Sequence, residues 1–293
     1  MRHEAYVLKQ LQGLAMWQGD IVHDGIRIFV QPYLKSRSKP DTNRIVAVTL
    51  DMAREQFSFS LQREYRKPGM TKESAGLRYA ALYAHEYGQE INDDQLQQVL
   101  DTVRSALKVL LGLTELIEEI CISYSVYVEQ NFPFQLDGTT ISPKLDLMFL
   151  NGRGRPVIVD WKTTTALTND YSRQLMVYAL AVRHWWKAMN PDDITVKEIN
   201  LLEGTTTTYP VNAQTLIEIE DFIYRSVAQI RDLVGDRKWE NQNLEDFEPA
   251  KSYRTCLYCN FRRLCQEVYR DLPSAESVQD QESKGTQLQL SLF

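Results

Sequence analysis

Apolar residues follow a helical spacing through most of the N-terminal third of the chain. Residues 1–38 are predicted to be helical, and residues 41–66 are predicted to form a further helix. The clearest helix covers residues 93–111, where Asp93 or Asp94 can cap the first turn. Its apolar stripe consists of Leu96, Leu100, Val103, Leu107 and Leu110. This part of the chain is therefore expected to be mainly helical.

The period of the pattern then changes to two. Between residues 120 and 129 every second residue is apolar, which predicts a half-polar strand that carries Cys121 and Glu129 on one face. Further elements are predicted as strands near 132–136, 143–150 and 155–163, a hairpin-type connection at 151–156, a helix at 168–189, one or two strands at 194–209 and a helix at 212–234. This order predicts an α/β core with helical additions.

One of these strands ends in charged residues, in the stretch PVIVDWKTTT. Its apolar run, residues 157–159, has no polar alternation and predicts a strand that is covered on both faces. Asp160 and Lys162 then share one face and Trp161 points to the other, because side chains alternate along a strand. Burying two charges is costly unless they are paired or bind a ligand. The pair is therefore either a structural ion pair or part of a site.

Carboxylates on the preceding strands favour a site. Asp146 lies in SPKLDLMFL and Glu129 lies in YVEQNFPF, and consecutive strands usually neighbour one another. Several carboxylates at one place repel, and a hard divalent cation such as Mg²⁺ removes that repulsion. Such an ion can polarise a phosphoryl oxygen and acidify a bound water, which is chemistry suited to phosphodiester hydrolysis. In the following helix, Gln174 and Tyr178 share a face at i and i+4.

Composition bounds these interpretations. The 293 residues, 43% of them hydrophobic, suffice for one large domain or two small ones. The net charge of −6 argues against a generally basic nucleic-acid binder, although it allows a local basic patch. The sequence has no long apolar run and no secretory signal, so we expect a cytoplasmic protein without a membrane partner. In a reducing compartment, clustered cysteines indicate metal binding rather than disulfides.

These motifs resemble the PD-(D/E)XK nucleases, and within them the RecB-like branch. Asp146 matches the first Asp, Asp160-Trp161-Lys162 matches the (D/E)xK element and Gln174-x-x-x-Tyr178 matches the QxxxY motif. MWQGDIVHDGI is similar to the N-terminal helix of that branch and contains His23. The resemblance spans roughly residues 15–265 and implies a restriction-endonuclease-like mixed central sheet flanked by helices. Helical N-terminal additions and a cysteine-bearing C-terminal segment complete the expected fold.

The resemblance also implies a role for each matched residue. Asp146 and Asp160 would hold a catalytic Mg²⁺ or Mn²⁺ together with the main-chain carbonyl of Trp161. His23 would bind the same ion, and the alternative is a core histidine hydrogen-bonded on its helix. Lys162 would serve the attacking water. Two further residues, Gln174 and Tyr178, would support the site and contact the nucleic acid.

The segment CLYCNFRRLC resembles the C-terminal cysteines of RecB-like nucleases that hold an iron–sulfur cluster. It supplies Cys256, Cys259 and Cys265, whereas a 4Fe–4S cluster generally needs four thiolates. The family takes its fourth cysteine from the N-terminus, and this sequence has none before Cys121. A lone strand cysteine is more typical of packing than of ligation. For the missing fourth ligand, the alternatives are that an upstream cysteine is lost because the chain starts late, that the site binds an incomplete cluster, or that it binds zinc. The segment 251–265 is also basic, as a phosphate-binding patch or a solvated face would be.

The C-terminus differs from the rest of the chain. We expect a nuclease domain over residues 1–270, with the cysteine segment at 251–265, and a disordered tail over residues 271–293. The tail ends in QLSLF, which resembles the peptide by which bacterial polymerases and repair proteins bind the sliding clamp. Its matching residues are Gln289, Leu290, Leu292 and Phe293. The alternative is that these apolar residues fold back onto the body.

Together these features predict a metal-dependent DNA nuclease, an exonuclease of repair or recombination that is tethered to the clamp. DNA and the clamp are the expected partners, and a helicase or another repair protein is a further candidate. The alternatives are a non-catalytic DNA- and clamp-binding protein, or a CRISPR-associated or RNA-directed nuclease.

Overall fold

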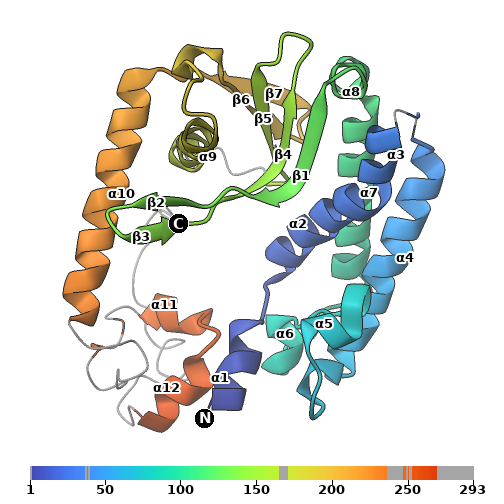
Figure 1. Ribbon diagram of the computed structural model, residues 1–293. Coiled ribbons are helices and arrows are strands. Elements are labelled where there is room, and N and C mark those ends of the chain that lie inside the picture. The colour runs from blue at the N-terminus through green and yellow to red at the C-terminus, as the bar shows by residue number, and fades with distance from the viewer. Residues whose placement is uncertain are drawn as a thin grey trace, which may run out of the picture. The chain divides into compact units, whose positions relative to one another are not determined.

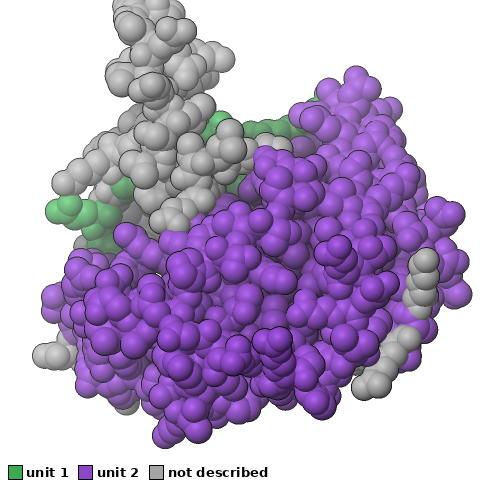
Figure 2. All heavy atoms as spheres, turned by 90° about the horizontal axis from the view of Figure 1, so that it is seen from above, with its two compact units in different colours: residues 1–13, 56–90, 237–293 green, residues 14–55, 91–236 purple. Residues whose placement is uncertain are grey.

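The structure is a computed structural model that describes residues 2–36, 38, 40–164, 171–235, 247–248, 250 and 253–268. It contains two compact units, which Figure 2 shows in different colours. Unit 1 comprises residues 1–13, 56–90 and 237–293, and unit 2 comprises residues 14–55 and 91–236. The predicted nuclease domain, residues 1–270, includes parts of both units, and the tail that contains the clamp-like peptide lies outside the described residues. Across the described ranges, no helix has the length and apolar character needed to cross a membrane.

Unit 2 is built on a five-stranded mixed sheet with the strand order β1-β4-β5-β6-β7. Its strands are β1 (Ser125–Asn131), β4 (Lys144–Leu150), β5 (Pro156–Lys162), β6 (Thr195–Asn200) and β7 (Thr205–Tyr209). The pair β5–β6 is parallel and the other pairs are antiparallel. A separate hairpin is formed by β2 (Phe134–Leu136) and β3 (Thr139–Ile141). The three strands predicted to carry carboxylates are therefore adjacent, with β4 in the middle.

Helices flank this sheet, as the sequence predicts. Two helices, α9 (Ser172–Trp185) and α10 (Ala213–Val234), lie on one side, where α9 buries Leu175 and Ala179 in a core shared with Ile158 and Val196 of the sheet (Figure 1). The remaining helices of this part are α2 (Leu14–Gly25), η1 (Ile26–Val30), α3 (Gln31–Ser36), α7 (Asp93–Gly112) and α8 (Thr114–Cys121), with α4 (Thr42–Leu61) shared between the units. On the second face of the sheet, Lys197 of β6 reaches Glu119 of α8, with Nζ and Oε2 3.8 Å apart.

The helix predicted at residues 93–111 is confirmed, but its predicted cap is wrong. Asn92, rather than Asp93 or Asp94, caps α7: its side chain accepts from the Gln95 amide at 2.9 Å. In return, the Gln95 side chain accepts from the Asn92 amide at 3.0 Å. Asn92 has the extended backbone that a cap requires, whereas the two aspartates already lie in the first helical turn.

Two local predictions are corrected by the structure. Cys121 ends α8 and does not lie on a strand, because Leu116 and Ile120 are buried at the helical i, i+4 spacing and β1 begins only at Ser125. The predicted helix over residues 1–38 is interrupted between Lys9 and Leu14. There the backbone of Gln12 pairs with Leu82, a non-local contact that no sequence period indicates.

Unit 1 is a small helical body with its own core. Its elements are α1 (Arg2–Lys9), η2 (Glu64–Arg66), α5 (Lys72–Ala75), η3 (Gly76–Arg78), α6 (Tyr83–Glu86), α11 (Tyr253–Leu257) and α12 (Arg262–Val268). Buried residues from α1 and from segment 59–83 form the core, and Leu264 of α12 packs against it. The cysteine segment thus joins a body made by the N-terminus and by the region after α4.

Candidate active site

Three carboxylates stand in a row across neighbouring strands of unit 2. The pairing of β1 with β4 matches Val128 to Leu147 and Gln130 to Leu145, which places Glu129 opposite Asp146. The pairing of β4 with β5 ends at Leu147 and Val159, so Asp146 and Asp160 are the next residues on each strand. The row therefore lies where β4 and β5 part.

The backbone secures two members of this row. The amide of Trp161 donates to Asp146 Oδ2 at 2.9 Å, which bridges the gap between β4 and β5 with a side chain. Glu129 has a φ of 50°, in the left-handed region that a residue with a Cβ seldom adopts. The Trp161 side chain itself is buried, at 3% exposure.

His23 of α2 completes a set of potential metal ligands. Its Nδ1 lies 3.4 Å from Asp146 Oδ1 and 3.6 Å from Glu129 Oε1. Over the described ranges, the only cluster of three His, Cys, Asp or Glu ligand atoms within 4.8 Å of one another comes from His23, Glu129 and Asp146. Carboxylate oxygens around a small space are the donors that hard divalent cations such as Mg²⁺ and Mn²⁺ take. The residues present fit such an ion.

His23 and Glu129 both have shifted pKa values in this cluster. Burial opposes the charged form of His23, but hydrogen bonds to Asp146 and Glu129 raise its pKa to about 10. Burial would also raise the pKa of Glu129, yet hydrogen bonds from His23 and Lys144 hold it below its usual value. Protonated His23 therefore offsets the negative charge of the two carboxylates, and it would have to release this proton to ligate a metal ion.

Asp160 and Lys162 form a close pair at the end of β5. Lys162 Nζ lies 2.7 Å from Asp160 Oδ2, and the two side chains are 13% and 2% exposed. Burial and the charge of Asp146 raise the pKa of Asp160 to about 6, although Lys162 opposes the rise. The two side chains thus lie on one face, as strand parity predicts, and they also form the ion pair that was the structural alternative.

The lysine also connects the row to α9. Lys162 Nζ donates to Gln174 Oε1 at 3.1 Å, and Gln174 Nε2 donates to the Tyr178 hydroxyl at 2.6 Å. Burial, with the charge of Asp160, raises the pKa of Tyr178, so its hydroxyl stays protonated. The i, i+4 pair on α9 therefore faces Lys162, where it can orient the ammonium group.

Sequence reasoning missed two residues of this region. Lys144 Nζ lies 2.5 Å from Glu129 Oε2, and the Tyr171 ring centre lies 3.9 Å from Lys162 Nζ. Lys144 is two positions before Asp146 on β4, so strand parity could have indicated it. Tyr171 lies in the range predicted as a helix, residues 168–189, but directly before the observed start of α9 at Ser172, and no motif pointed to it.

Small residues bring α2 close enough for His23 to reach the row. Gly19 of α2 faces Thr163, and a Cβ at Gly19 would lie 3.2 Å from Thr163 Oγ1. Gln18 Nε2 donates to the Thr163 carbonyl at 3.4 Å. The helix that carries His23 is thereby attached to the chain directly after Lys162.

The cysteine segment belongs to unit 1 and is fixed by side chains of α6. The hydroxyls of Tyr83 and Tyr87 donate to the carbonyls of Leu257 and Asn260, at 2.5 and 2.8 Å. Burial and the nearby thiols of Cys259 and Cys256 raise the pKa of Cys265. All four cysteines are free, and Cys121 lies in unit 2. Among the described residues, the ligand atoms of His23, Glu129 and Asp146 all lie within 4.8 Å of one another, whereas the sulfurs of Cys256, Cys259 and Cys265 do not.

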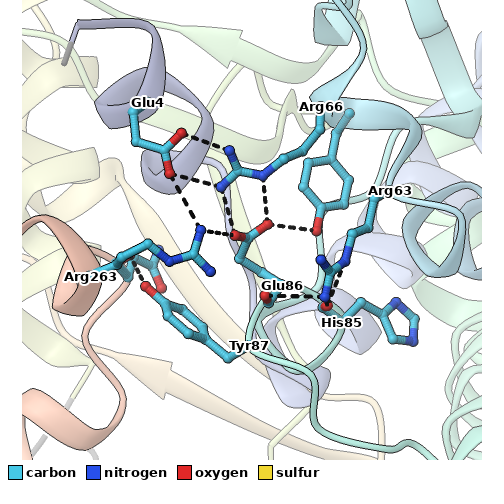
Figure 3. A network of polar contacts seen from close by, with 9 residues as sticks. Glu4, Arg63, Arg66, His85, Glu86, Tyr87 and Arg263 are labelled. Atoms are coloured by element: carbon cyan, nitrogen blue, oxygen red, sulfur yellow. Dashed lines mark hydrogen bonds and ion pairs between the residues drawn. The ribbon is translucent and has the colours of Figure 1, made fainter.

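A buried ion network holds this segment to unit 1 (Figure 3). The Glu86 carboxylate, 1% exposed, accepts from Arg66 Nη2 at 2.6 Å and lies 3.1 Å from Arg263 Nη1. Arg66 also donates to Glu4 at 2.6 Å, and Tyr65 donates to Glu86 at 3.1 Å. The network joins α1, η2, α6 and α12, so the cysteine segment is anchored by charge as well as by the tyrosines.

Comparison with known proteins assigns the family. The model of the PD-(D/E)XK nuclease superfamily matches residues 4–266, and the chain belongs to that superfamily. The family places it among divalent-metal-dependent nucleases that hydrolyse phosphodiester bonds in DNA. No curated protein matches the sequence. Among solved structures, the crystal structure of SSO0001 is similar at 13% identity and a TM-score of 0.31, over 76% of this chain and 98% of that chain. This likeness is too distant to carry an argument.

Proposed function

We propose that the chain is a RecB-like exonuclease that acts on DNA in repair or recombination. The observation that carries the proposal is the convergence of His23, Glu129 and Asp146 beside the Asp160–Lys162 pair. The same constellation lies within hydrogen-bonding reach of Gln174 on α9. This is the set of groups that hydrolysis of a phosphodiester needs: metal ligands, a cation for the developing charge and polar side chains that hold them in place.

In this proposal each residue has a distinct task. A Mg²⁺ or Mn²⁺ ion would be held by His23, Glu129, Asp146 and Asp160, with the main-chain carbonyl of Trp161. When bound, it would supply polarisation of the phosphate and a more acidic water. Lys162, held by Gln174, orients the attacking water and offsets negative charge on the phosphate. Tyr178 keeps its proton and fixes Gln174 through the hydrogen bond between them.

The proposal is tested by cleavage of matched linear and circular DNA, single- and double-stranded, with Mg²⁺, Mn²⁺ or EDTA. An exonuclease degrades only the linear forms, and Asp160→Asn or Lys162→Ala abolishes that degradation. Asp101→Asn is the matched control, since Asp101 is an exposed residue of α7. Nicking of circular DNA would make the enzyme an endonuclease. Cleavage of RNA alone would favour the RNA-directed alternative, and binding without cleavage would favour the non-catalytic one.

The cysteine segment supports a second metal site in this proposal. Cys256, Cys259 and Cys265 would ligate an iron–sulfur cluster or a zinc ion, with the fourth ligand unassigned. Support comes from the thiols of Cys259 and Cys256, which lie near enough to Cys265 to raise its pKa, and from the hydroxyls of Tyr83 and Tyr87, which fix the segment. A structural metal would stabilise this segment directly, because ligand binding and folding are coupled there.

The C-terminal peptide supports a tether to the sliding clamp. Gln289, Leu290, Leu292 and Phe293 lie outside the described residues, so the support is the sequence alone. A clamp tether would concentrate the nuclease on DNA that already carries a clamp. A helicase or another repair protein remains a candidate partner of the same assembly.

A further inference from the structure

A cavity of about 510 Å³ opens between α9, the end of β7 and the first half of α10. Figure 1 shows these helices on the same side of the sheet. Buried Met176 and Ile219 contribute apolar surface to the cavity, and Phe222, Arg173 and Arg225 are exposed residues of its lining. The volume is within the range of small-molecule sites.

The lining combines an aromatic ring with two guanidinium groups. The Arg173 guanidinium carbon lies 5.0 Å from the centre of the Phe222 ring, and Phe222 is 37% exposed. The carboxylate of the lining, Glu218, accepts from Gln214 Nε2 at 3.0 Å. The lining also holds two guanidinium groups, so its net charge is positive, next to an exposed ring on which a planar group can stack. Stacking on an aromatic ring with phosphate contacts from Arg is how single-stranded nucleic acid is bound.

Two chains of contacts connect the cavity to the candidate active site. Tyr171 lies over Lys162, and the next two residues, Ser172 and Arg173, line the cavity. On the other side, Asp160 pairs in register with Glu198 of β6. The hydroxyl of Tyr209, which also lines the cavity, donates to Glu198 Oε2 at 3.2 Å. Two short series of contacting residues thus link the cavity lining to Lys162 and Asp160 of the candidate active site.

We propose that this cavity binds one nucleotide of single-stranded DNA next to the cut phosphate, with its base on the Phe222 ring and its phosphate on Arg173 and Arg225. The inference rests on the proposed nuclease function, which it deepens by assigning a strand-binding subsite. Ring stacking of a base is worth roughly 1–3 kcal/mol, which corresponds to an affinity change of about 5- to 150-fold. The exposed position of Phe222 means that its replacement leaves the core of unit 2 intact.

The test measures binding of short single-stranded DNA by fluorescence anisotropy in the Asp160→Asn background, where no cleavage interferes. Phe222→Ala and Arg173→Ala should each weaken binding at least fivefold, and Phe222→Tyr, which keeps an aromatic ring, should bind as tightly as the parent. Tyr224→Ala is the matched control, because Tyr224 is an exposed aromatic residue of the same helix that does not line the cavity. DNA with an abasic site at one particular position should show the same loss of affinity as Phe222→Ala. The Phe222→Ala variant should bind that abasic DNA no more weakly than it binds intact DNA.

Equal affinity of Phe222→Ala and Tyr224→Ala for single-stranded DNA would overturn the subsite. A loss of affinity that is the same wherever the abasic site is placed would also overturn it. Tighter binding of duplex DNA or of RNA than of single-stranded DNA would overturn the assigned ligand. Because binding is measured without cleavage, these outcomes are independent of the nuclease assay. In the parent protein, Phe222→Ala should raise KM more than it lowers kcat, since Phe222 would hold the strand and is not among the groups proposed to act on the phosphate.

Discussion

Asp146 and Asp160 are the first residues beyond the last matched pair of β4 and β5, Leu147 and Val159. Two carboxylates are thereby held together where the strands separate, and the charge of Asp146 is one cause of the raised pKa of Asp160. A folded state that keeps two such groups together has a free-energy cost that a bound cation or a proton removes. The stability of unit 2 and its chemistry are therefore linked at one point.

Asp160→Asn should affect DNA cleavage and the stability of unit 2 in opposite directions. Cleavage should fall by at least about a hundredfold, while stability without metal should rise at pH 7–8 by up to about 3 kcal/mol. The sign follows from the pKa of Asp160, which burial raises from 3.8 to about 6: the folded state favours the protonated form, so stability is lost as pH rises through this range. The gain should disappear below pH 4, where the carboxyl is neutral in both states. Urea unfolding with EDTA at both pH values checks this, and an equal gain at both would contradict it.

Gly25→Ala should destabilise unit 2 by about 1–3 kcal/mol, the usual cost of overpacking. A Cβ at Gly25 would lie 2.9 Å from Thr49 Cγ2, and Thr49 is fully buried with its hydroxyl bonded to the Ile45 carbonyl. Because the same helix carries His23, metal affinity should fall as well. A Cβ at Gly25 would also lie 3.0 Å from Thr49 Oγ1, so the double variant Gly25→Ala/Thr49→Ala, which removes both crowded atoms, should recover part of the loss in a urea titration. Gly13→Ala is the control, since nothing lies within 4 Å of a Cβ there.

Glu86→Ala should loosen the cysteine segment of unit 1. The substitution removes the buried partner of Arg66 and Arg263, which are themselves partly exposed, so the loss should be about 1.5–3 kcal/mol, as for hydrogen bonds to a charged group. The rate at which a thiol reagent labels Cys256, Cys259 and Cys265 in the folded protein reports this opening. Asp51→Ala, which breaks an exposed pair with Arg54, should leave the rate unchanged. Slow labelling in both variants would mean that the network does not hold the segment.

The protein prepared without oxygen should be brown and contain iron. Cys256→Ala or Cys259→Ala should remove the colour and make the C-terminal segment sensitive to protease, because the metal contributes to its folding. Cys121→Ala should change neither property, since Cys121 ends α8 in unit 2. The absorption spectrum and metal analysis decide the result. A colourless preparation with zinc, or with no metal, would reject the iron–sulfur cluster.

Deletion of residues 289–293 should abolish binding to a sliding clamp and leave cleavage of free oligonucleotides unchanged. Leu292 and Phe293 would enter an apolar pocket, each worth roughly 1.5–3 kcal/mol. Ordering of the tail offsets much of this gain, so the affinity should be about micromolar. Isothermal titration measures it, with Leu292→Ala/Phe293→Ala as the variant that keeps the length. An absence of heat with the intact chain, or unfolding of the body on deletion, would contradict the tether.

The features of this protein that depend on local period could be predicted from the sequence. Strand parity places Asp160 and Lys162 on one face, and helical spacing places Gln174 and Tyr178 on one face of α9. Both patterns are fixed by backbone geometry within a few residues, so they can be read without knowing the fold. The adjacency of β1, β4 and β5 followed from their order along the chain, because consecutive strands usually pair.

Contacts between segments far apart in the sequence could be seen in the folded structure alone. It brought His23 against Glu129 and Asp146, gave Lys144 and Tyr171 their charged partners, and placed Cys121 at the end of a helix. These contacts arise from packing, such as the close approach of Gly19 to Thr163, between residues far apart in sequence. A local hydrophobic pattern tells which face of an element is buried, but it does not encode which other element covers that face. The strand row was therefore predictable, whereas the completed ligand set required the fold.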